Sequence, residues 1–123
     1  MKVISTPNAP AAIGPYSQAI ISNGMVYTSG QIAIDPASGK IVGSTIEEQA
    51  EQVCKNVKAL LEASGTSMEK VVKTVCFLAD MGDFAVFNGI YAKYFVSNPA
   101  RSCVAVKTLP KNVLVEIDTI TEL

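Results

Sequence analysis

The stretch SQAIISNGMVYTS, residues 17–29, contains the clearest structural signal of the sequence. Two short segments rich in Ile, Val, Tyr and Thr flank the dipeptide Asn23-Gly24. Asparagine and glycine both tolerate positive φ, which the two central residues of a type I′ turn require. The sequence therefore predicts a β-hairpin whose strands are residues 17–22 and 25–29.

A helix is predicted over residues 45–64, after a polar turn cluster at 35–40. Thr45 and Glu48 form a capping-box pattern, and Gly65 supplies the left-handed residue that ends many helices. Apolar side chains recur at helical spacing, and charged side chains fall mainly on the opposite side. The apolar positions are Ile46, Ala50, Val53, Val57, Leu60 and Leu61.

The rest of the chain adds one helix and three strands. Residues 5–10 contain two prolines and are expected to form an extended arm. The predicted elements are a strand at 71–78, a helix from about 83 to 95, and strands at 101–106 and 113–120. The order β-β-α-β-α-β-β predicts an α+β layer with two helices on one face of a sheet.

The length of 123 residues fits a single domain, residues 1–123. Hydrophobic residues make up 49% and charged residues only 17%, against roughly 25% charged in an average soluble domain. Two helices cover one sheet face, so the other face would expose Ile, Val and Ala. We therefore expect self-association through that face, with a ligand cleft at the subunit boundary.

Composition also excludes several function classes. The net charge of −1 provides no general attraction for nucleic acid, and no apolar run approaches the ~20 residues that a membrane span requires. Histidine is absent, which removes His-based metal sites and Ser-His or Cys-His nucleophile pairs. Cys54, Cys76 and Cys103 show no CxxC spacing, so neither a metal site nor a disulfide framework is expected. The absence of a signal-peptide pattern predicts a cytoplasmic protein.

Arg101 is the single arginine among ten basic residues, and it lies in an otherwise apolar predicted strand. Strand alternation places it on one face with Cys103 and Ala105. A guanidinium in that setting suits a planar anion, and a ligand carboxylate fits it in a bidentate way. A structural ion pair with Asp or Glu, or an edge position with the head group in water, is the alternative.

Glu116 has a similar profile in the last predicted strand, on the face opposite its apolar neighbours. If the last two strands pair antiparallel around the loop 107–112, Cys103 lies opposite Glu116 and Arg101 lies opposite Asp118. Glu116 and Arg101 are then diagonal neighbours, roughly 7–8 Å apart at the backbone, with room for a small anion and a water. A simple Arg–Glu or Arg–Asp cross-strand bridge is the alternative interpretation.

Three further residues are candidates for a binding cleft. Tyr16 follows the rigid turn Gly14-Pro15, where its hydroxyl could reach a ligand or a backbone carbonyl. Gly30 ends a strand and permits either a bulge or a close backbone approach. Asn88 lies on the aromatic stripe of the second helix, where it needs partners from the protein or from a ligand.

Taken together, these segments resemble the RidA (YjgF-type) family along nearly the whole chain. The matching segments are GPYSQA at 14–19, SGQI at 29–32, PARSCV at 99–104, LPK at 109–111 and VEID at 115–118. The resemblance implies a chorismate-mutase-like α+β fold and a homotrimer with clefts between subunits. It also implies an imine deaminase that hydrolyses 2-aminoacrylate and 2-iminobutyrate to 2-oxo acids and ammonia without a cofactor.

The resemblance also implies roles for the candidate residues. Arg101 would hold the substrate carboxylate, Glu116 would orient or activate the attacking water, and the backbone of Cys103 would contact the imine or its water. The cleft would be completed by Tyr16, Gly30 and Asn88, with Tyr16 contributed across an interface. Two other functions remain as alternatives. One is a non-catalytic sensor of small carboxylates, and the other is a ribonuclease or translation inhibitor, which the absent histidines and the net charge disfavour.

Overall fold

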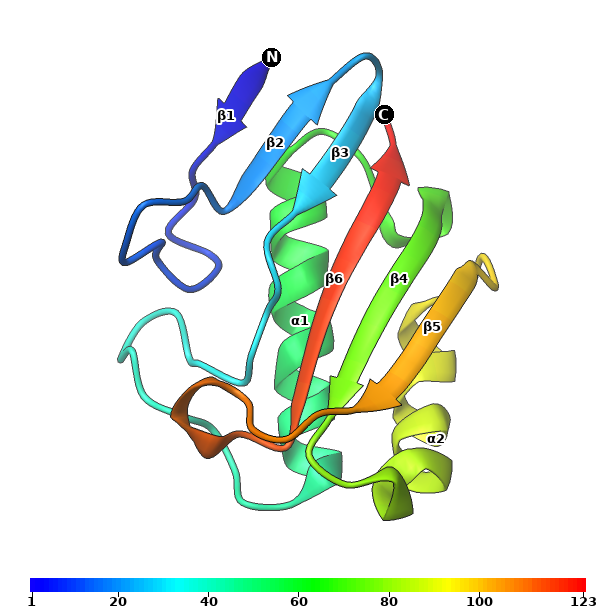
Figure 1. Cartoon of the computed structure of the whole chain (residues 1–123). Helices are drawn as coiled ribbons and strands as arrows, with labels where there is room; N and C mark the ends of the chain where they lie inside the picture. The colour runs from blue at the N-terminus through cyan, green and yellow to red at the C-terminus, as the bar shows by residue number, and fades with distance from the viewer.

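The computed structural model describes all 123 residues, and it shows a six-stranded mixed sheet with two α-helices on one face (Figure 1). This is the predicted α+β architecture. The strands are β1 (Lys2–Ile4), β2 (Ala19–Ser22), β3 (Met25–Thr28), β4 (Val71–Leu78), β5 (Ala100–Ala105) and β6 (Val115–Glu122). The helices are α1 (Ile46–Ala63) and α2 (Phe84–Tyr94), with 3₁₀ turns at Met68–Lys70, Met81–Asp83 and Pro110–Asn112.

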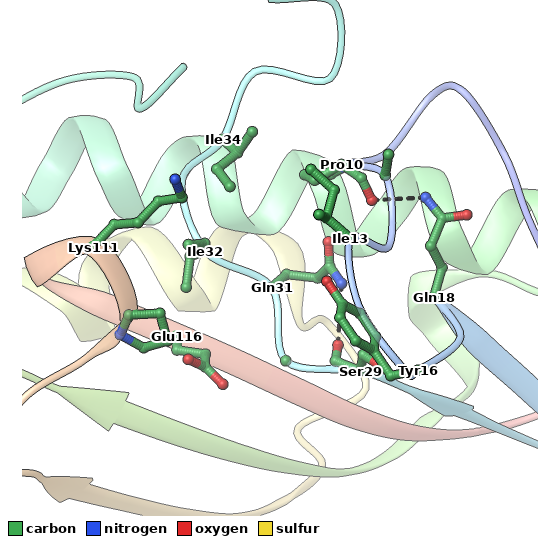
Figure 2. Close-up of a pocket in the computed structure, with 13 residues that line it drawn as sticks. Pro10, Ile13, Tyr16, Gln18, Ser29, Gln31, Ile32, Ile34, Lys111 and Glu116 are labelled. Carbon is green, nitrogen blue, oxygen red and sulfur yellow. Dashed lines mark hydrogen bonds between the residues drawn. The ribbon is translucent and has the colours of Figure 1, made fainter. Parts of the chain in front are cut away.

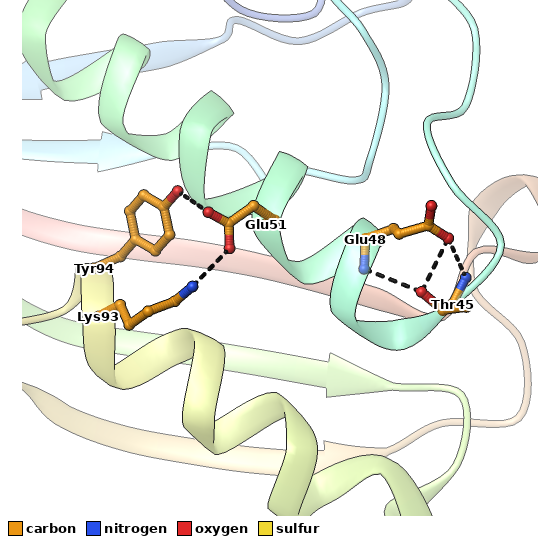
Figure 3. A network of polar contacts seen from close by, with 5 residues as sticks. All are labelled: Thr45, Glu48, Glu51, Lys93 and Tyr94. Atoms are coloured by element: carbon orange, nitrogen blue, oxygen red, sulfur yellow. Dashed lines mark hydrogen bonds and ion pairs between the residues drawn. The ribbon is translucent and has the colours of Figure 1, made fainter.

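Elements that depend on local sequence form as predicted. Asn23 and Gly24 have φ angles of 52° and 74°, and they join β2 to β3 as the hairpin turn. At the start of α1, the backbone N–H of Glu48 donates to Thr45 Oγ1 at 3.2 Å, and the backbone N–H of Thr45 donates to Glu48 Oε1 at 3.2 Å (Figure 3). This reciprocal capping box satisfies two N–H groups that a helix otherwise leaves unpaired.

Helix α1 packs its apolar side against the sheet and forms the centre of the core. Val53, Val57 and Leu61 are fully buried there, together with Phe87 of α2 and Ile117 of β6. Burying one such side chain stabilises the fold by about 1.5–3 kcal/mol, so the packing of the two helices on the sheet is a main source of stability. Helix α2 is tied to α1 at its end, where the hydroxyl of Tyr94 donates to Glu51 Oε1 at 2.5 Å (Figure 3).

The strand order, β1-β2-β3-β6-β4-β5, corrects one prediction and adds a strand. Residues Lys2–Ile4 form β1, which the sequence analysis did not predict. The last two strands do not pair. Strand β5 lies parallel to β4 at the sheet edge, and β6 runs antiparallel between β3 and β4. The connection through α2 produces this arrangement, because a crossover helix brings the following strand parallel to the preceding one.

The two faces of the sheet have different surroundings. On the helix-covered face, Thr74, Cys76 and Ile117 are buried. On the opposite face, Tyr27 and Val104 are exposed, and Phe77, Val75 and Ile120 are only partly buried. The face predicted to lack cover therefore does carry apolar side chains at the surface. No helix of the chain has the length and hydrophobicity needed to cross a membrane.

Candidate functional site

A cavity of about 590 Å³ lies where three loops meet beside the carboxyl end of β3 and the start of β6 (Figure 2). Its walls come from the N-terminal loop, from the segment after β3, and from the turn before β6. The lining residues include three that were predicted from the sequence, namely Tyr16, Gly30 and Glu116. The other lining residues are Pro10, Ala11, Ile13, Gln18, Ser29, Gln31, Ile32, Ile34, Pro110 and Lys111.

The alternation of β6 directs the side chain of Glu116 away from the core. Val115 and Ile117 are fully buried on the helix-covered face, so the residue between them must face the other side. Gln31 and Ile117 then fix the neighbouring loop by two backbone hydrogen bonds, of 2.8 Å from Gln31 N–H and 3.1 Å from Ile117 N–H. These bonds bring Gly30 directly against Glu116.

Gly30 leaves open the space that the Glu116 carboxylate occupies. A Cβ atom at this position would lie 2.8 Å from Cδ of Glu116, and it would meet a carboxylate oxygen of that residue even more closely. Any larger residue would therefore push the carboxylate from its position. Of the two interpretations that the sequence left open at Gly30, a bulge or a close approach, the structure shows a close approach, and the approaching group is the side chain of Glu116.

Burial raises the pKa of the Glu116 carboxyl above its ordinary value, and the nearby carboxylate of Asp118 raises it further. Burial also raises the pKa of Asp118. Neither residue has a cationic partner, because the two salt bridges of the structure are Lys58–Glu62 and Lys93–Glu51. A partly desolvated, unpaired carboxyl at a cavity wall is well placed to accept a proton.

Gln18 anchors the loop that carries Tyr16, and the sequence analysis missed it. Its amide nitrogen lies 3.0, 3.2 and 2.7 Å from the carbonyl oxygens of Thr6, Ala9 and Pro10, and its side-chain oxygen accepts from Thr6 N–H at 2.7 Å. The available signal was a glutamine inside the predicted apolar strand 17–22; in the structure Gln18 lies just before β2 and is buried. Tyr16 itself is 54% exposed at the cavity edge.

Gln31 is a second lining residue that the sequence analysis did not single out. Its side chain is only 5% exposed, and its amide nitrogen donates to the carbonyl of Ser29 at 3.1 Å. Its side-chain oxygen is the one buried side-chain polar atom without a hydrogen-bond partner. The cavity wall therefore contains an acceptor that is not satisfied by the protein.

Arg101 lies on the other face of the sheet, where its side chain contacts residues of α2. Its Nη1 donates to Oδ1 of Asn88 at 2.7 Å. The guanidinium carbon lies 4.8 Å from the ring centre of Tyr91 and 5.3 Å from that of Phe84, within the range of cation–π contacts. Tyr91 is fixed in turn by a 2.7 Å hydrogen bond with Thr74. The prediction that Asn88 has a polar partner is confirmed.

The predicted diagonal pairing of Arg101 with Glu116 is wrong within one chain. Strand β4 separates the two strands, and the side chains project from opposite faces. The predicted placements of Arg101 opposite Asp118 and of Cys103 opposite Glu116 are wrong for the same reason. The alternative of a structural ion pair also fails, because Arg101 bonds to a neutral amide and forms no salt bridge.

Cys103 lies on the same face as Arg101, with Cys76 as its neighbour on β4. Burial raises the pKa of the Cys103 thiol, although the nearby charge of Arg101 acts in the opposite direction. The thiol is therefore protonated near neutral pH and is a poor nucleophile. No group of three or more Cys, Asp or Glu side chains is arranged to hold a metal ion.

The fold and the site together define a class of protein. It is a chorismate-mutase-like α+β sheet with one face covered by helices, and it carries an arginine and a glutamate without ion-pair partners on opposite faces. Residues 6–123 match the family described as Endoribonuclease L-PSP. The chain belongs to this family, and the resemblance to RidA proteins is confirmed.

Individual relatives are similar over nearly the whole chain. The human protein named 2-iminobutanoate/2-iminopropanoate deaminase is 48% identical over 97% of this chain and 88% of its own length. The structure of RidA from an Antarctic Psychrobacter has a TM-score of 0.95 at 42% identity and covers 100% of both chains. The structure of E. coli TdcF with bound serine also has a TM-score of 0.95, at 41% identity over 100% of both chains.

Proposed function

We propose that the protein hydrolyses small 2-imino acids, including 2-iminobutyrate and the imine form of 2-aminoacrylate, to 2-oxo acids and ammonia. One observation carries the proposal: neither Arg101 nor Glu116 has an ion-pair partner. The guanidinium of Arg101 is held by Asn88, and the carboxyl of Glu116 is partly buried. A fixed cation suits a substrate carboxylate, and a carboxyl with a raised pKa suits proton transfer at the adjacent carbon. The name of the human relative supports the same activity.

The two groups can serve one substrate only if they come from different copies of the chain. They project from opposite faces of the same sheet, so a substrate that touches both must lie between copies. The apolar open face, which includes Tyr27 and Val104, provides a surface for such an assembly. We assign the protein a homotrimeric state in which each cleft receives Arg101 and Asn88 from one copy and Tyr16, Gly30 and Glu116 from its neighbour.

In the proposed mechanism, Arg101 holds the carboxylate of the protonated imine by two N–H groups that Asn88 leaves free. Glu116 accepts a proton from a water molecule as the water oxygen bonds to C2 of the substrate. Glu116 returns that proton to the nitrogen of the resulting carbinolamine. As the C–N bond breaks, Glu116 takes the proton of the C2 hydroxyl, so that the C=O bond of the 2-oxo acid forms. That proton then passes to the released ammonia, which leaves as ammonium, and Glu116 is again a carboxylate. The backbone at Cys103 contacts the imine or its water. Positioning and electrostatics supply the catalysis, with no covalent intermediate.

The description of the family as endoribonucleases provides a competing function. RNA cleavage by acid–base chemistry commonly uses histidine, which this chain lacks, and its net charge of −1 gives no attraction for RNA. A sensor that binds small carboxylates without turnover is the other alternative.

Three free thiols agree with a reducing cytoplasmic location, which we include in the proposal.

The proposal is tested by adding the protein to a threonine dehydratase reaction and following the lifetime of 2-iminobutyrate. We expect faster ammonia release with the wild-type protein and a loss of about 30- to 1000-fold in kcat/KM for Arg101→Lys, which keeps the charge but loses the planar fork. Binding of 2-oxobutyrate without faster hydrolysis would favour the sensor. Cleavage of RNA without imine hydrolysis would favour the ribonuclease.

Assembly is tested separately by sedimentation at micromolar concentration. We expect one species with three times the 13.0 kDa mass of the chain. A stable monomer with full deaminase activity would contradict a site built from two copies.

Arg101→Ala should keep its thermal midpoint close to that of the wild type, because only a neutral hydrogen bond and ring contacts are lost.

A further inference from the structure

The guanidinium of Arg101 is held by neutral groups of α2. Its central carbon lies 4.8 Å from the ring centre of Tyr91 and 5.3 Å from that of Phe84, and its Nη1 donates to Asn88 at 2.7 Å. Neither an aromatic ring nor an amide neutralises a positive charge, and both salt bridges of the structure involve other residues. The side chain is therefore held in place while its charge remains available to an anion.

The ring of Tyr91 is itself fixed by the core. It stacks on the ring of Phe95, with 4.3 Å between the ring centres and 21° between the planes, and it lies 5.6 Å from the ring of Phe87. Its hydroxyl forms a 2.7 Å hydrogen bond with Thr74. Because Phe87, Phe95 and Thr74 are all fully buried, the ring of Tyr91 cannot shift without disturbing close-packed neighbours.

The hydrogen bond of Tyr91 also connects α2 to the sheet beside Arg101. Helix α2 lies against β4 and β5 (Figure 1), and Thr74 on β4 is the register partner of Arg101 on β5. Burial raises the pKa of the Tyr91 hydroxyl, so this group stays protonated near neutral pH. Tyr91 therefore supports the guanidinium without becoming an anionic partner for it.

We propose that Tyr91 is a positioning residue for the deaminase reaction, and that its ring fixes the orientation in which Arg101 meets the substrate carboxylate. An arginine that is free to change rotamer must be ordered by its ligand, which lowers affinity, and a ring that orders it beforehand removes this loss. Since the carboxylate is present in both substrate and transition state, the effect should fall on KM rather than on kcat. This inference rests on the proposed deaminase function.

Two substitutions in the full-length protein separate the ring of Tyr91 from its hydroxyl. Tyr91→Leu removes the ring, so Kd for 2-oxobutyrate and KM for 2-iminobutyrate should both rise by about three- to tenfold, with kcat changed less than about twofold. Tyr91→Phe keeps the ring and should keep Kd and KM within about twofold. Its thermal midpoint should nevertheless fall, because Thr74 loses its partner, and adding Thr74→Val should restore much of the midpoint.

Phe87→Leu is the matched control for the loss of a buried ring. Phe87 lies on the same helix and next to Tyr91, whereas the rings within cation–π range of Arg101 are those of Tyr91 and Phe84. Phe87→Leu should lower the thermal midpoint at least as much as Tyr91→Leu and leave Kd and KM within about twofold. If Tyr91 only stabilised the fold, Kd and KM would change together with the midpoint in both variants.

Nuclear magnetic resonance reports on the orientation of Arg101 directly. The chain contains one arginine, so its ¹⁵N–¹H spectrum has a single Nε–Hε signal that needs no assignment. Nitrogen relaxation measures how ordered this bond is on the picosecond to nanosecond timescale. We expect an ordered bond in the wild type, Tyr91→Phe and Phe87→Leu, and a mobile bond in Tyr91→Leu.

The outcomes separate this inference from the function on which it rests. An ordered Nε–Hε bond in Tyr91→Leu, unchanged Kd and KM in that variant, or an equal rise of both in Phe87→Leu overturns the role of Tyr91 and leaves the deaminase proposal in place. Wild-type protein that binds 2-oxobutyrate without accelerating imine hydrolysis overturns the deaminase proposal. In that case, Kd and the relaxation data still decide whether Tyr91 orients Arg101 towards a carboxylate. Wild-type protein that neither binds 2-oxobutyrate nor hydrolyses imines overturns both proposals.

Discussion

Two glutamates of this chain occupy contrasting environments. Glu51 on α1 accepts hydrogen bonds from Tyr94 at 2.5 Å and from Lys93 at 3.3 Å, as Figure 3 shows. The bond from Tyr94, and then the contact with Lys93, lower the pKa of Glu51. Glu116 on β6 has no such partner, and burial together with Asp118 raises its pKa.

The contrast is between a carboxylate whose charge stabilises the folded protein and one whose charge destabilises it. The charged form of Glu51 is favoured in the native protein, so it helps to hold α2 against α1. The charged form of Glu116 is disfavoured in the native protein, so it costs stability near neutral pH. A carboxyl that burial destabilises, placed at a cavity wall against a glycine, fits a chemical role better than a structural one.

The largest expected difference between the two residues is in catalysis. Glu116→Gln keeps the side-chain shape and removes the proton acceptor, so kcat should fall by about 10²- to 10⁴-fold. Glu51→Gln should keep activity within about twofold, because its partners lie between the helices. Initial rates of imine hydrolysis on folded protein measure both. Comparable losses in the two variants would mean that Glu116 has no special role.

Gly30→Ala should show an intermediate effect. The new Cβ displaces the Glu116 carboxyl, and we expect kcat to fall by about 10- to 100-fold while KM changes less. Gly89→Ala is the matched control, because a Cβ at Gly89 meets nothing within 4 Å. That variant should keep activity and gain up to about 1 kcal/mol of helix stability. Full activity of Gly30→Ala would show that the position of the carboxyl is not critical.

The dependence of stability on pH should have opposite signs for the two residues. The ordinary pKa of both is 4.5, raised in the fold for Glu116 and lowered for Glu51. Ionisation of Glu116 therefore lowers the free energy of unfolding as pH rises through its native pKa. Below about pH 4 the residue is protonated in both states and has no such effect. Glu51 adds stability above pH 4.5 that is lost as pH falls through its native pKa.

Urea unfolding between pH 4 and pH 8 tests this difference. Glu116→Gln should be more stable than the wild type at pH 8 and equal to it at pH 4. Glu51→Gln should be less stable at pH 8, with the difference shrinking towards low pH. Destabilisation by Glu116→Gln at pH 8 would indicate that this carboxylate has a stabilising partner after all.

The smallest effect is expected for Cys103→Ala. The pKa of this thiol is raised, and the proposed contact with the substrate uses the backbone. Activity should stay within a few-fold of the wild type, with an unchanged thermal midpoint. Abolished turnover in a folded variant would assign the sulfur a direct role.

Local sequence signals predicted most individual elements. The Asn23-Gly24 turn, the capping box at Thr45 and the strand 71–78 depend on neighbouring residues, and each is confirmed. The strand β1 and the sheet order could not be predicted in this way. Both depend on pairings between distant residues, such as Lys2 with Ile21 and Val75 with Asp118.

The candidate site shows the same limit. Strand alternation correctly separated Glu116 from its core neighbours, and Asn88 was correctly selected as a polar residue with a partner. The relation between Arg101 and Glu116 was predicted wrongly, because it depended on which strands pair. Tyr91, which packs on the guanidinium, was indistinguishable from the core aromatic residues of its helix until the position of β5 was known.

The central claim is that Arg101 of one copy and Glu116 of its neighbour act on one substrate, and mixing inactive variants tests it most directly. Arg101→Ala and Glu116→Gln carrying different tags are unfolded together in equal amounts, refolded, and shown to co-purify. A site needs an intact arginine from one copy and an intact glutamate from the next, so about a quarter of wild-type deaminase activity should return. Co-purifying mixed assemblies with no more activity than the separate variants would contradict the shared site.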